Sequence, residues 1–439
     1  MTHSGTGGFG SVAAVLEAGA IGAVFQPLVD LETRSPVAYE ALARGPAGTR
    51  WESPATLFAA AAEDGMVPEL DWACRAAAYR AALNAGMTAA TPLFVNVEPV
   101  SLRTACPPHL REVIGAAAGR LNIVYEVTER AVAHDPAGLL AAVVGARAAG
   151  IGIALDDVGA EPASLAMMPF VDPDVIKLDL RLIQDRTSPE VAGIVTAVLA
   201  HAERTGARIL AEGIEQSRHI DIARTLGATL GQGFLFGRPG PLPRPPRPPG
   251  GPPGAALRLR PAADIRPADT PFSVVSACRP TIRSPKDLLL PLSLHLERRS
   301  QAAEPGVLLA CFQHVRHFTP ATRRRYEELT RSTVLTAALG LDMPALPAAD
   351  VRGGRLGTDD PLRGEWNVIV VGPQFASALV ARDLGDDGPD PQRRFDAVIT
   401  HDRELVIKAA LTLVSRVLAQ PATGGGIGAE TPLLVDSRR

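Results

Sequence analysis

Apolar runs in the first half of this 439-residue chain repeatedly end in an acidic or amide residue. The run Leu93–Val95 ends at Asn96, and the run Gly152–Leu155 ends at Asp156 and Asp157. The other members of this pattern are Glu126, Lys177, Glu212 and Gln232. Acids that converge on one place repel one another unless cations neutralise them, and oxygen ligands with one amide suit Mg²⁺ or Mn²⁺ better than zinc. The pattern therefore predicts two divalent cations holding an attacking water and a phosphate oxygen, with Lys177 to orient the water or offset phosphate charge.

A less specific interpretation fits each acid taken alone. An acid after a strand is more often a helix N-cap or a solvated loop charge than a catalytic group. Capping does not readily explain several strands that end alike, so we expect these groups to converge.

Alternating strands and helices are the elements that would bring the groups together. Short apolar runs alternate with alanine-rich helical stretches, which predicts a mostly parallel sheet, and about 240 residues suit a (β/α)₈ barrel. In such a barrel, catalytic groups lie where the strands end at one mouth. The expected strands are Leu93–Asn96, Asn122–Glu126, Ile151–Asp156, Val175–Leu178 and Arg208–Glu212, and the expected helices include Pro136–Ala149 and Pro189–Thr205.

Composition divides the chain into four parts. We expect a barrel at 1–240, a linker at 241–268, a smaller α/β domain at 269–420 and a flexible tail at 421–439. The linker prediction rests on the proline run Pro239–Pro261, because proline fixes φ and removes backbone donors. A semi-rigid spacer is the first interpretation, and a proline-rich ligand for a partner groove is the alternative.

The region after the linker also mixes the two kinds of element. The expected strands are Val307–Phe312, Trp366–Val371 and Arg394–Thr400, and the expected helices are Arg323–Leu339, Phe375–Leu384 and Arg403–Leu418. Arg323, Arg324 and Arg325 open the first of these helices. They would either bind an anion or simply be solvated.

Bulk properties exclude several classes of protein. The formal net charge is −3 and the pI is near 6.3, so there is no global basic field to hold nucleic acid. Met1–Gly10 lacks the features of a signal peptide, and Leu139–Leu155 is too short and interrupted to span a bilayer. The cysteines have no C-x-x-C spacing, which predicts free thiols in a reducing compartment. We expect a cytoplasmic protein with no membrane span.

Seven sequence blocks between Phe25 and Pro239 resemble the EAL family of cyclic di-GMP phosphodiesterases. The first contains the tripeptide Glu40-Ala41-Leu42 that names the family. The blocks read FQPLVDLETRSPVAYEALARG, LFVNVEP, YEVTER, IALDDVG, DVIKLDL, ILAEGIE and LGQGFLFGRP. Their order and spacing make the resemblance specific, whereas the tripeptide alone would not.

The resemblance implies a TIM-type barrel with one antiparallel strand, a homodimer formed through this domain, and cleavage of cyclic di-GMP to linear pGpG with two Mg²⁺ or Mn²⁺ ions per site. The residues that resemble the family's metal ligands are Glu40, Asn96, Glu126, Asp156 and Asp157. Lys177, Glu212 and Gln232 resemble its catalytic groups. Gln26 and Arg44 resemble its substrate contacts, and Glu129, Asp179 and Glu215 resemble residues that support the ligands.

The loop after Asp157 departs from the family's usual pattern. Active relatives usually read DDFGTGYSS, whereas this chain reads DDVGAEPAS over Asp156–Ser164. Glu161 adds negative charge near the expected diphosphate, and Pro162 stiffens the turn. A catalytically weak or inactive cyclic di-GMP receptor is therefore the alternative to an active hydrolase.

The second region resembles the DICT domain, a sensory module attached to cyclic di-GMP and two-component signalling proteins. The resemblance rests on the blocks FTPATRRRYEEL, VRGGRL, DDPLRGEW, VVGPQFASALVARDLGD and RRFDAVITHDRELV. It implies a sensory domain that modulates the barrel, with a signal or partner that the sequence does not identify.

Overall fold

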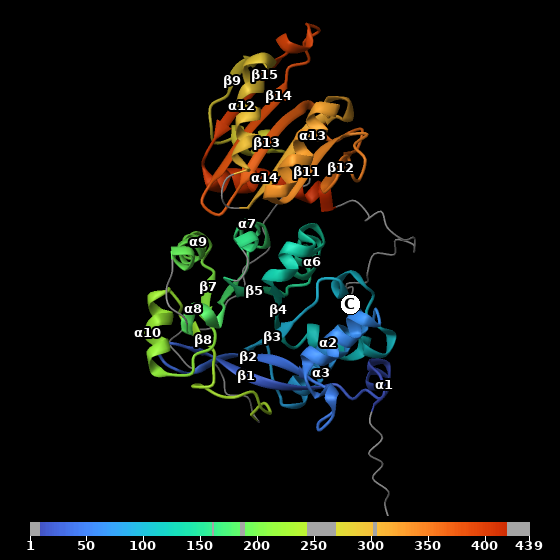
Figure 1. The fold of residues 1–439 in the computed structure, drawn as a ribbon, viewed down its shortest axis with the longest axis vertical. Coiled ribbons are helices and arrows are strands. Elements are labelled where there is room, and N and C mark those ends of the chain that lie inside the picture. Colours follow the sequence, from blue (N-terminus) through green and yellow to red (C-terminus); the bar gives the residue numbers. More distant parts are fainter. Residues whose placement is uncertain (1–8, 160–161, 185–188, 244–268, 302–304, 419–439) are drawn as a thin grey trace, which may run out of the picture.

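The first domain closes into an eight-stranded barrel (Figure 1). The computed structural model describes residues 9–159, 162–184, 189–243, 269–301 and 305–418. The barrel strands are β1 (Gly22–Asp30), β2 (Pro36–Arg44), β3 (Pro92–Asn96), β4 (Asn122–Thr128), β5 (Gly152–Val158), β6 (Val175–Leu178), β7 (Arg208–Ala211) and β8 (Leu230–Gly231). β1 pairs antiparallel with β2 and β8, and the other neighbours pair parallel. The predicted TIM-type barrel is confirmed.

One apolar side chain from each strand fills the barrel interior. These residues are Leu28, Ala38, Phe94, Val124, Ala154, Val175, Leu210 and Leu230, none more than 1% exposed. Side chains alternate between the two faces of a strand, so their neighbours in sequence point outward against the helices. The interior of the barrel is therefore a packed core rather than a pore.

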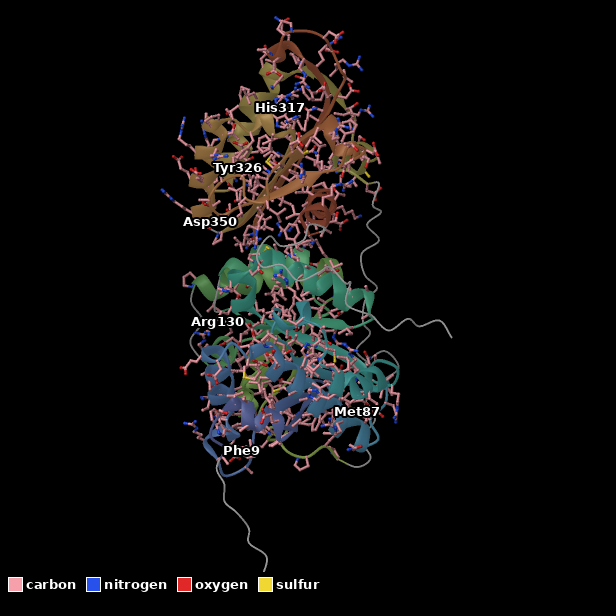
Figure 2. The ribbon with its side chains drawn as sticks, turned by 90° about the vertical axis from the view of Figure 1, so that its right-hand side faces the viewer. Phe9, Met87, Arg130, His317, Tyr326 and Asp350 are labelled. Atoms are coloured by element: carbon pink, nitrogen blue, oxygen red, sulfur yellow. The ribbon has the colours of Figure 1, made fainter. Side chains whose placement is uncertain are left out.

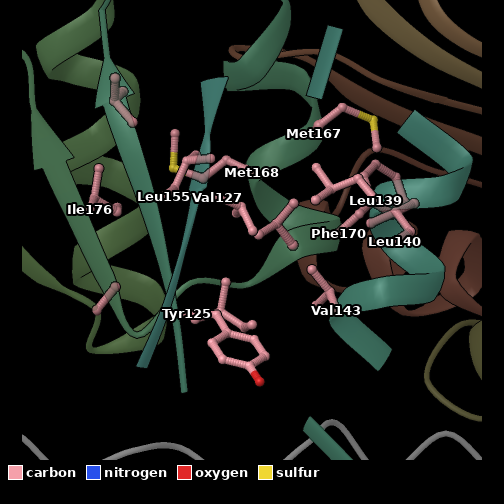
Figure 3. Close-up of a cluster of buried hydrophobic side chains, with 14 of the residues drawn as sticks. Tyr125, Val127, Leu139, Leu140, Val143, Leu155, Met167, Met168, Phe170 and Ile176 are labelled. Atoms are coloured by element: carbon pink, nitrogen blue, oxygen red, sulfur yellow. The ribbon is translucent and has the colours of Figure 1, made fainter. Parts of the chain in front are cut away.

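Helices cover the outside of the barrel. They are α1 (Val12–Glu17), α2 (Pro54–Glu63), α3 (Val67–Asn84), α4 (Arg111–Ala118), α5 (Glu129–His134), α6 (Pro136–Ala148), α7 (Pro162–Val171), α8 (Leu180–Gln184), α9 (Pro189–Thr205) and α10 (Ser217–Thr225). The Asp135 carboxylate caps α6 by accepting from the Gly138 amide at 3.0 Å. Figure 3 shows Leu139 and Leu140 of α6 beside Phe170 of α7, where the two helices share one apolar cluster.

The second domain is a seven-stranded mixed sheet with helices on both faces. Its strand order is β12-β11-β10-β13-β14-β15-β9. The strands are β9 (Ile282–Pro285), β10 (Gly306–His314), β11 (Thr333–Leu341), β12 (Val351–Leu356), β13 (Glu365–Val371), β14 (Ala376–Asp383) and β15 (Arg394–Thr400). α11 (Pro271–Ser276) and α14 (Arg403–Leu418) pack on one face, and α12 (Lys286–Arg299) and α13 (Pro320–Leu329) on the other. This confirms a second, smaller α/β domain.

Two helix predictions in this domain are wrong. The segment predicted as a helix at Phe375–Leu384 is β14, and the helix predicted at Arg323–Leu339 ends with α13 at Leu329, before β11. Both strands lie inside the sheet and are buried on both faces. Such a strand has no alternation of apolar and polar residues, so its sequence cannot be told from that of a buried helix by periodicity.

A shared apolar core joins the two domains. The largest cluster of buried side chains runs from the barrel and α7 to α14 and the adjoining face of the second sheet. α7 contacts β10, β11 and α14, and α6 contacts β11 and α14 (Figure 1). At the edge of this interface, Arg352 forms an ion pair with Asp135 at 3.1 Å. The barrel's α6–α7 surface is thus covered by the chain's own second domain.

The predicted linker and tail fall largely outside the described residues, as residues 244–268 and 419–439 do. The domain boundaries therefore stay predictions. Within the described part of the chain, every helix is too short or too polar to cross a bilayer.

Phe94 offers a test of how much the packed barrel interior contributes to the stability of the fold. Phe94→Ala leaves a cavity in a fully buried layer, and we expect the free energy of unfolding to fall by about 3–5 kcal/mol. Equilibrium urea unfolding followed by circular dichroism measures the change. Val144→Ala, at a position 60% exposed on α6, is the control and should change stability by less than about 0.5 kcal/mol. Equal effects of both substitutions would contradict this description of the interior.

Candidate active site

A polar layer sits directly above the apolar layer of the barrel. Each of its members lies two residues from an interior apolar residue, as Asn96 does from Phe94 and Glu40 from Ala38. The layer consists of Gln26, Glu40, Asn96, Glu126, Asp156, Lys177, Glu212 and Gln232. Gln26 precedes Leu28 because β1 runs antiparallel to its neighbours. The two-residue repeat of a strand therefore turns all eight side chains toward one mouth, and the structure brings these predicted residues together.

Lys177 lies at the centre of the layer and is 1% exposed. Its Nζ is 2.7 Å from Glu126 Oε1, 2.8 Å from Glu212 Oε1, 2.9 Å from Asp156 Oδ1 and 3.7 Å from Glu40 Oε2. One buried ammonium group thus faces four carboxylates, which are positioned by the four strands β2, β4, β5 and β7. Its positive charge is what lets these acids approach one another in the structure.

Side-chain amides fix the orientation of Glu40. Asn96 Nδ2 donates to Glu40 Oε1 at 3.0 Å and to Glu126 Oε2 at 3.1 Å. Gln232 Nε2 donates to Glu40 Oε2 at 2.5 Å and to Gln26 Oε1 at 3.1 Å. Both oxygens of Glu40 are therefore held, and the amides link β1, β2, β3 and β4 across the mouth.

A bulge in β5 brings two consecutive aspartates to the same site. Neighbouring residues of a regular strand point to opposite faces, but the pairing of β5 with β6 shifts between Leu155 and Val158. Asp157 has a φ of 57°, in the left-handed region, and this turn lets its carboxylate return to the mouth. Oxygens of Asp156, Asp157 and Glu212 lie within 4.8 Å of one another. They form a cluster that would hold a metal ion.

Burial and mutual repulsion shift the pKa values of the carboxylates, because a single ammonium group offsets their charge only in part. Burial raises the pKa of Glu126 well above its usual value, and Glu40 adds to the effect while Lys177 opposes it. Burial likewise raises the pKa of Glu212 to about 8 against the attraction of Lys177. Burial also tends to raise the pKa of Glu40, but Lys177 and the hydrogen bond from Gln232 outweigh it and hold that pKa below its usual value. Burial and the neighbouring Asp156 raise the pKa of Asp157.

These groups fit a divalent-cation site. Four carboxylates lie within 4.0 Å of a single ammonium group and a fifth, Asp157, lies beside two of them. Hard cations prefer such oxygen ligands. Glu126 Oε1 and Asp156 Oδ1 are buried, and the partner that the structure gives each of them is Lys177 Nζ, at 2.7 Å and 2.9 Å. The donor set and these two oxygens suit Mg²⁺ or Mn²⁺.

Glu129 braces the loop that follows Asp157. It is 1% exposed, and its Oε1 accepts from the Gly159 amide at 3.4 Å and from the Ser164 hydroxyl. The family resemblance implies a supporting role for Glu129, and these hydrogen bonds connect it to the loop after Asp157. Ala160 and Glu161, the centre of the unusual loop, lie outside the described residues.

Three other predicted residues contact groups outside the carboxylates that surround Lys177. Arg44, at the end of β2, donates to its neighbouring Ala43 carbonyl at 2.7 Å. Asp179 accepts from the Arg181 amide at 2.7 Å and from Arg181 Nε at 2.9 Å, at the start of α8. The Glu215 side chain is exposed, and its backbone amide donates to His219 Nδ1 at 3.3 Å. Their proposed roles stay predictions.

A buried ion pair beside the site was missed by the sequence analysis. Arg75 and Asp71 of α3 are 2.9 Å apart and almost fully buried. Asp71 accepts from the Glu98 amide at 3.1 Å, and Arg75 donates to the Ser101 hydroxyl at 3.1 Å. The pair thus anchors the segment that follows Asn96. Its only signal in the sequence is the i, i+4 spacing of opposite charges on one helix, which is common on solvated surfaces.

Two family models match the chain. The model described as "EAL domain" matches residues 11–239, and the model described as "Sensory domain in DIguanylate Cyclases and Two-component system" (DICT) matches residues 273–384. Together they reproduce the order of domains expected from the sequence.

Similar proteins from Pseudomonas aeruginosa include two named as cyclic di-GMP phosphodiesterases. RocR is 33% identical over 121 residues, which cover 27% of this chain and 31% of RocR. PA2567 is 28% identical over 229 residues, which cover 49% of this chain and 38% of PA2567. The chain therefore spans well under half the length of these curated relatives.

A similar solved structure is the Klebsiella pneumoniae BlrP1 manganese/cy-diGMP complex. It is 30% identical to this chain, with a TM-score of 0.44, and the match covers 50% of this chain and 56% of BlrP1.

The raised pKa of Glu212 predicts that metal affinity depends on pH. A carboxyl group with a pKa of about 8 carries a proton below that pH, and a cation must displace this proton to bind. We expect the affinity for Mn²⁺ to rise from about pH 6 to about pH 9, with protons released on binding. Calorimetry in buffers of different ionisation enthalpy measures both. Glu212→Gln should remove most of the dependence near pH 8, and an affinity that does not change with pH would contradict the prediction.

Proposed function

The chain belongs to the EAL-domain family over residues 11–239, and from this premise we propose that its barrel binds cyclic di-GMP and hydrolyses one phosphodiester to give linear pGpG. The observation that carries the proposal is the polar layer, in which four carboxylates lie within 4.0 Å of Lys177 Nζ and a fifth, Asp157, lies beside them. The names of the relatives RocR and PA2567 give further support.

The carboxylates have a defined role in this proposal. Glu40, Asn96, Glu126, Asp156 and Asp157 would hold two Mg²⁺ or Mn²⁺ ions, and Glu212 would complete the second position. When bound, such ions polarise the phosphate and lower the pKa of a bound water. The hydrogen bonds from Asn96 and Gln232 to Glu40 fix the ligand geometry before substrate arrives. This pre-organisation is worth most in a buried site.

Lys177 and Gln232 would act on the attacking water. Four carboxylates hold the pKa of Lys177 well above its usual value although burial opposes them, so the group is an ammonium that donates hydrogen bonds. Gln232 Oε1 is buried and has no hydrogen-bond partner among the described residues. It offers an acceptor for a water on the side of Glu40. Gln26 and Arg44 would contact the dinucleotide at the rim.

A receptor without turnover is the second candidate function. The observation in its favour is the loop Val158–Ser164, which departs from the pattern of active relatives at five positions that include Glu161 and Pro162. The retained bracing of Gly159 and Ser164 by Glu129 favours hydrolysis instead. Both candidates share binding of cyclic di-GMP by the barrel.

The second domain would modulate the barrel through α7. This helix directly follows the unusual loop and shares a core with β10, β11 and α14. Ser164, within α7, is bonded to Glu129 next to the site. A shift of the second domain would therefore move the loop that carries Asp157.

The proposal also includes a homodimer formed through the barrel and a cytoplasmic location. The second domain covers part of the α6–α7 surface, so the proposed dimer would form through another part of the barrel.

Glu40→Gln tests the proposed hydrolysis. The substitution removes a buried ligand charge while keeping its shape, and we expect turnover of cyclic di-GMP with Mn²⁺ to fall roughly 100-fold or more. Chromatography of the pGpG product measures turnover, and binding in Ca²⁺ is measured in parallel. Glu32→Gln, at an exposed position in the turn between β1 and β2, is the control and should retain full activity. Equal turnover in both variants would remove Glu40 from the mechanism.

Restoring the loop tests the choice between hydrolase and receptor. Replacing Ala160–Ala163 with Thr-Gly-Tyr-Ser removes the extra acid and the proline, and keeps the buried Val158. We expect faster turnover with little change in cyclic di-GMP affinity, because the metal ligands are untouched. Single-turnover kinetics and equilibrium binding separate the two quantities. Turnover that stays the same or falls would mean that the native loop is not what limits the reaction.

A further inference from the structure

A cavity opens on the face of the second sheet that is turned away from the barrel. It lies between α12 and α13 and has a volume of about 790 Å³, which is within the usual range for small-molecule sites. All of its lining residues belong to the second domain. Figure 2 labels one of them, His317, in the upper body near Tyr326 of α13.

Aromatic side chains form the floor of the cavity. Phe312, Trp366 and Phe395 come from β10, β13 and β15, and none is more than 8% exposed. Trp366 and Phe395 meet edge to face at 5.8 Å. Leu290 of α12, on the wall, is 43% exposed. An apolar wall open to solvent above buried aromatic rings favours a ligand with a ring of its own.

The cavity lining carries four cationic and three acidic side chains, the acids being Asp287, Glu297 and Asp390. The cationic lining residues are Lys286, Arg298, Arg316 and Arg325. Lys286 is paired with Asp390 at 2.5 Å, and Arg325 with Glu297 at 2.6 Å. Within the described ranges, neither Arg298 nor Arg316 has a carboxylate within 4.0 Å. Two guanidinium groups are thus available to an anion.

A buried acid holds one of the paired arginines in place. Glu297 is 2% exposed and accepts from Arg325 Nε and, at 3.1 Å, from the Tyr326 hydroxyl. The terminal nitrogens of Arg325 make no hydrogen bond within the described part of the chain. A guanidinium fixed through Nε presents two parallel N–H groups, the geometry that matches a carboxylate.

His317 lines the same rim as a neutral ring. Burial, and then Lys286 and Arg316, lower its pKa to about 4, although Asp390 opposes them. At the same rim, Gln313 has a φ of 63°, a strained backbone of the kind that clusters at ligand sites.

We propose that this cavity binds a small aromatic carboxylate, and that this ligand is the signal of the second domain. The ring lies over Phe312, Trp366 and Leu290, and the carboxylate meets Arg316 and Arg325. β10 carries Phe312 into the cavity, and its opposite face contacts α7 of the barrel. Binding of a ligand in this cavity would therefore affect α7, the helix that follows the Asp157 loop. The binding itself does not depend on hydrolysis by the barrel.

Direct binding of a probe to the full chain tests the proposal. The probe is 1-naphthoate, with 1-naphthamide as its neutral counterpart and cyclohexanecarboxylate as its non-aromatic counterpart, measured by isothermal titration calorimetry. We expect 1-naphthoate to bind at least about tenfold tighter than either counterpart, because only it satisfies both the ring and the charge. Equal binding of 1-naphthoate and 1-naphthamide would overturn the proposal.

Three variants locate the binding. Arg316→Gln should weaken 1-naphthoate about tenfold, and Leu290→Glu should abolish binding by placing an acid on the wall. Both positions are exposed enough for the fold to survive, which thermal melts verify. Arg324→Gln, an exposed α13 arginine outside the cavity, is the matched control. A loss in the control equal to that of Arg316→Gln, or no loss in either cavity variant, would overturn the assignment whatever the activity of the barrel.

Discussion

The imbalance of charge around Lys177 is the constraint on which the rest of the barrel depends. Five acids converge on one buried ammonium group, an arrangement that repels itself unless more positive charge arrives. The protein accommodates it by burying two of the acids with raised pKa values, Glu126 and Glu212, and by clamping Glu40 between amides. The apolar layer below must then supply the stability that the polar layer does not.

The position of the polar layer could be predicted because it follows from the strand repeat. Asn96, Glu126 and Asp156 each end an apolar run, and in a closed parallel barrel such ends can only meet at one mouth. The bulge that returns Asp157 to the site could not be predicted, since a local shift of pairing leaves no clear mark in the residues. The buried ion pair between Asp71 and Arg75 could not be predicted either, because the tertiary fold decides whether these residues are buried.

In the second domain, the pattern of apolar residues did not distinguish buried strands from helices. β11 and β14 are covered on both faces, so their apolar runs lack a period, and their helical prediction was overridden by pairing with β10 and β13. The contact of α7 with this sheet was equally hidden. A helix that packs against the barrel on one side and against another domain on the other is apolar all round. The sequence of α7, Pro162–Val171, has this property.

The separation of apolar and polar layers carries an evolutionary consequence. Folding free energy comes mainly from residues such as Phe94 and Leu210, which never touch a ligand, while the acids above them oppose it. Mutations that remove the acids of the polar layer would therefore leave the fold intact, or even raise its free energy of unfolding. Selection on the fold alone would therefore place little constraint on the acids of the polar layer.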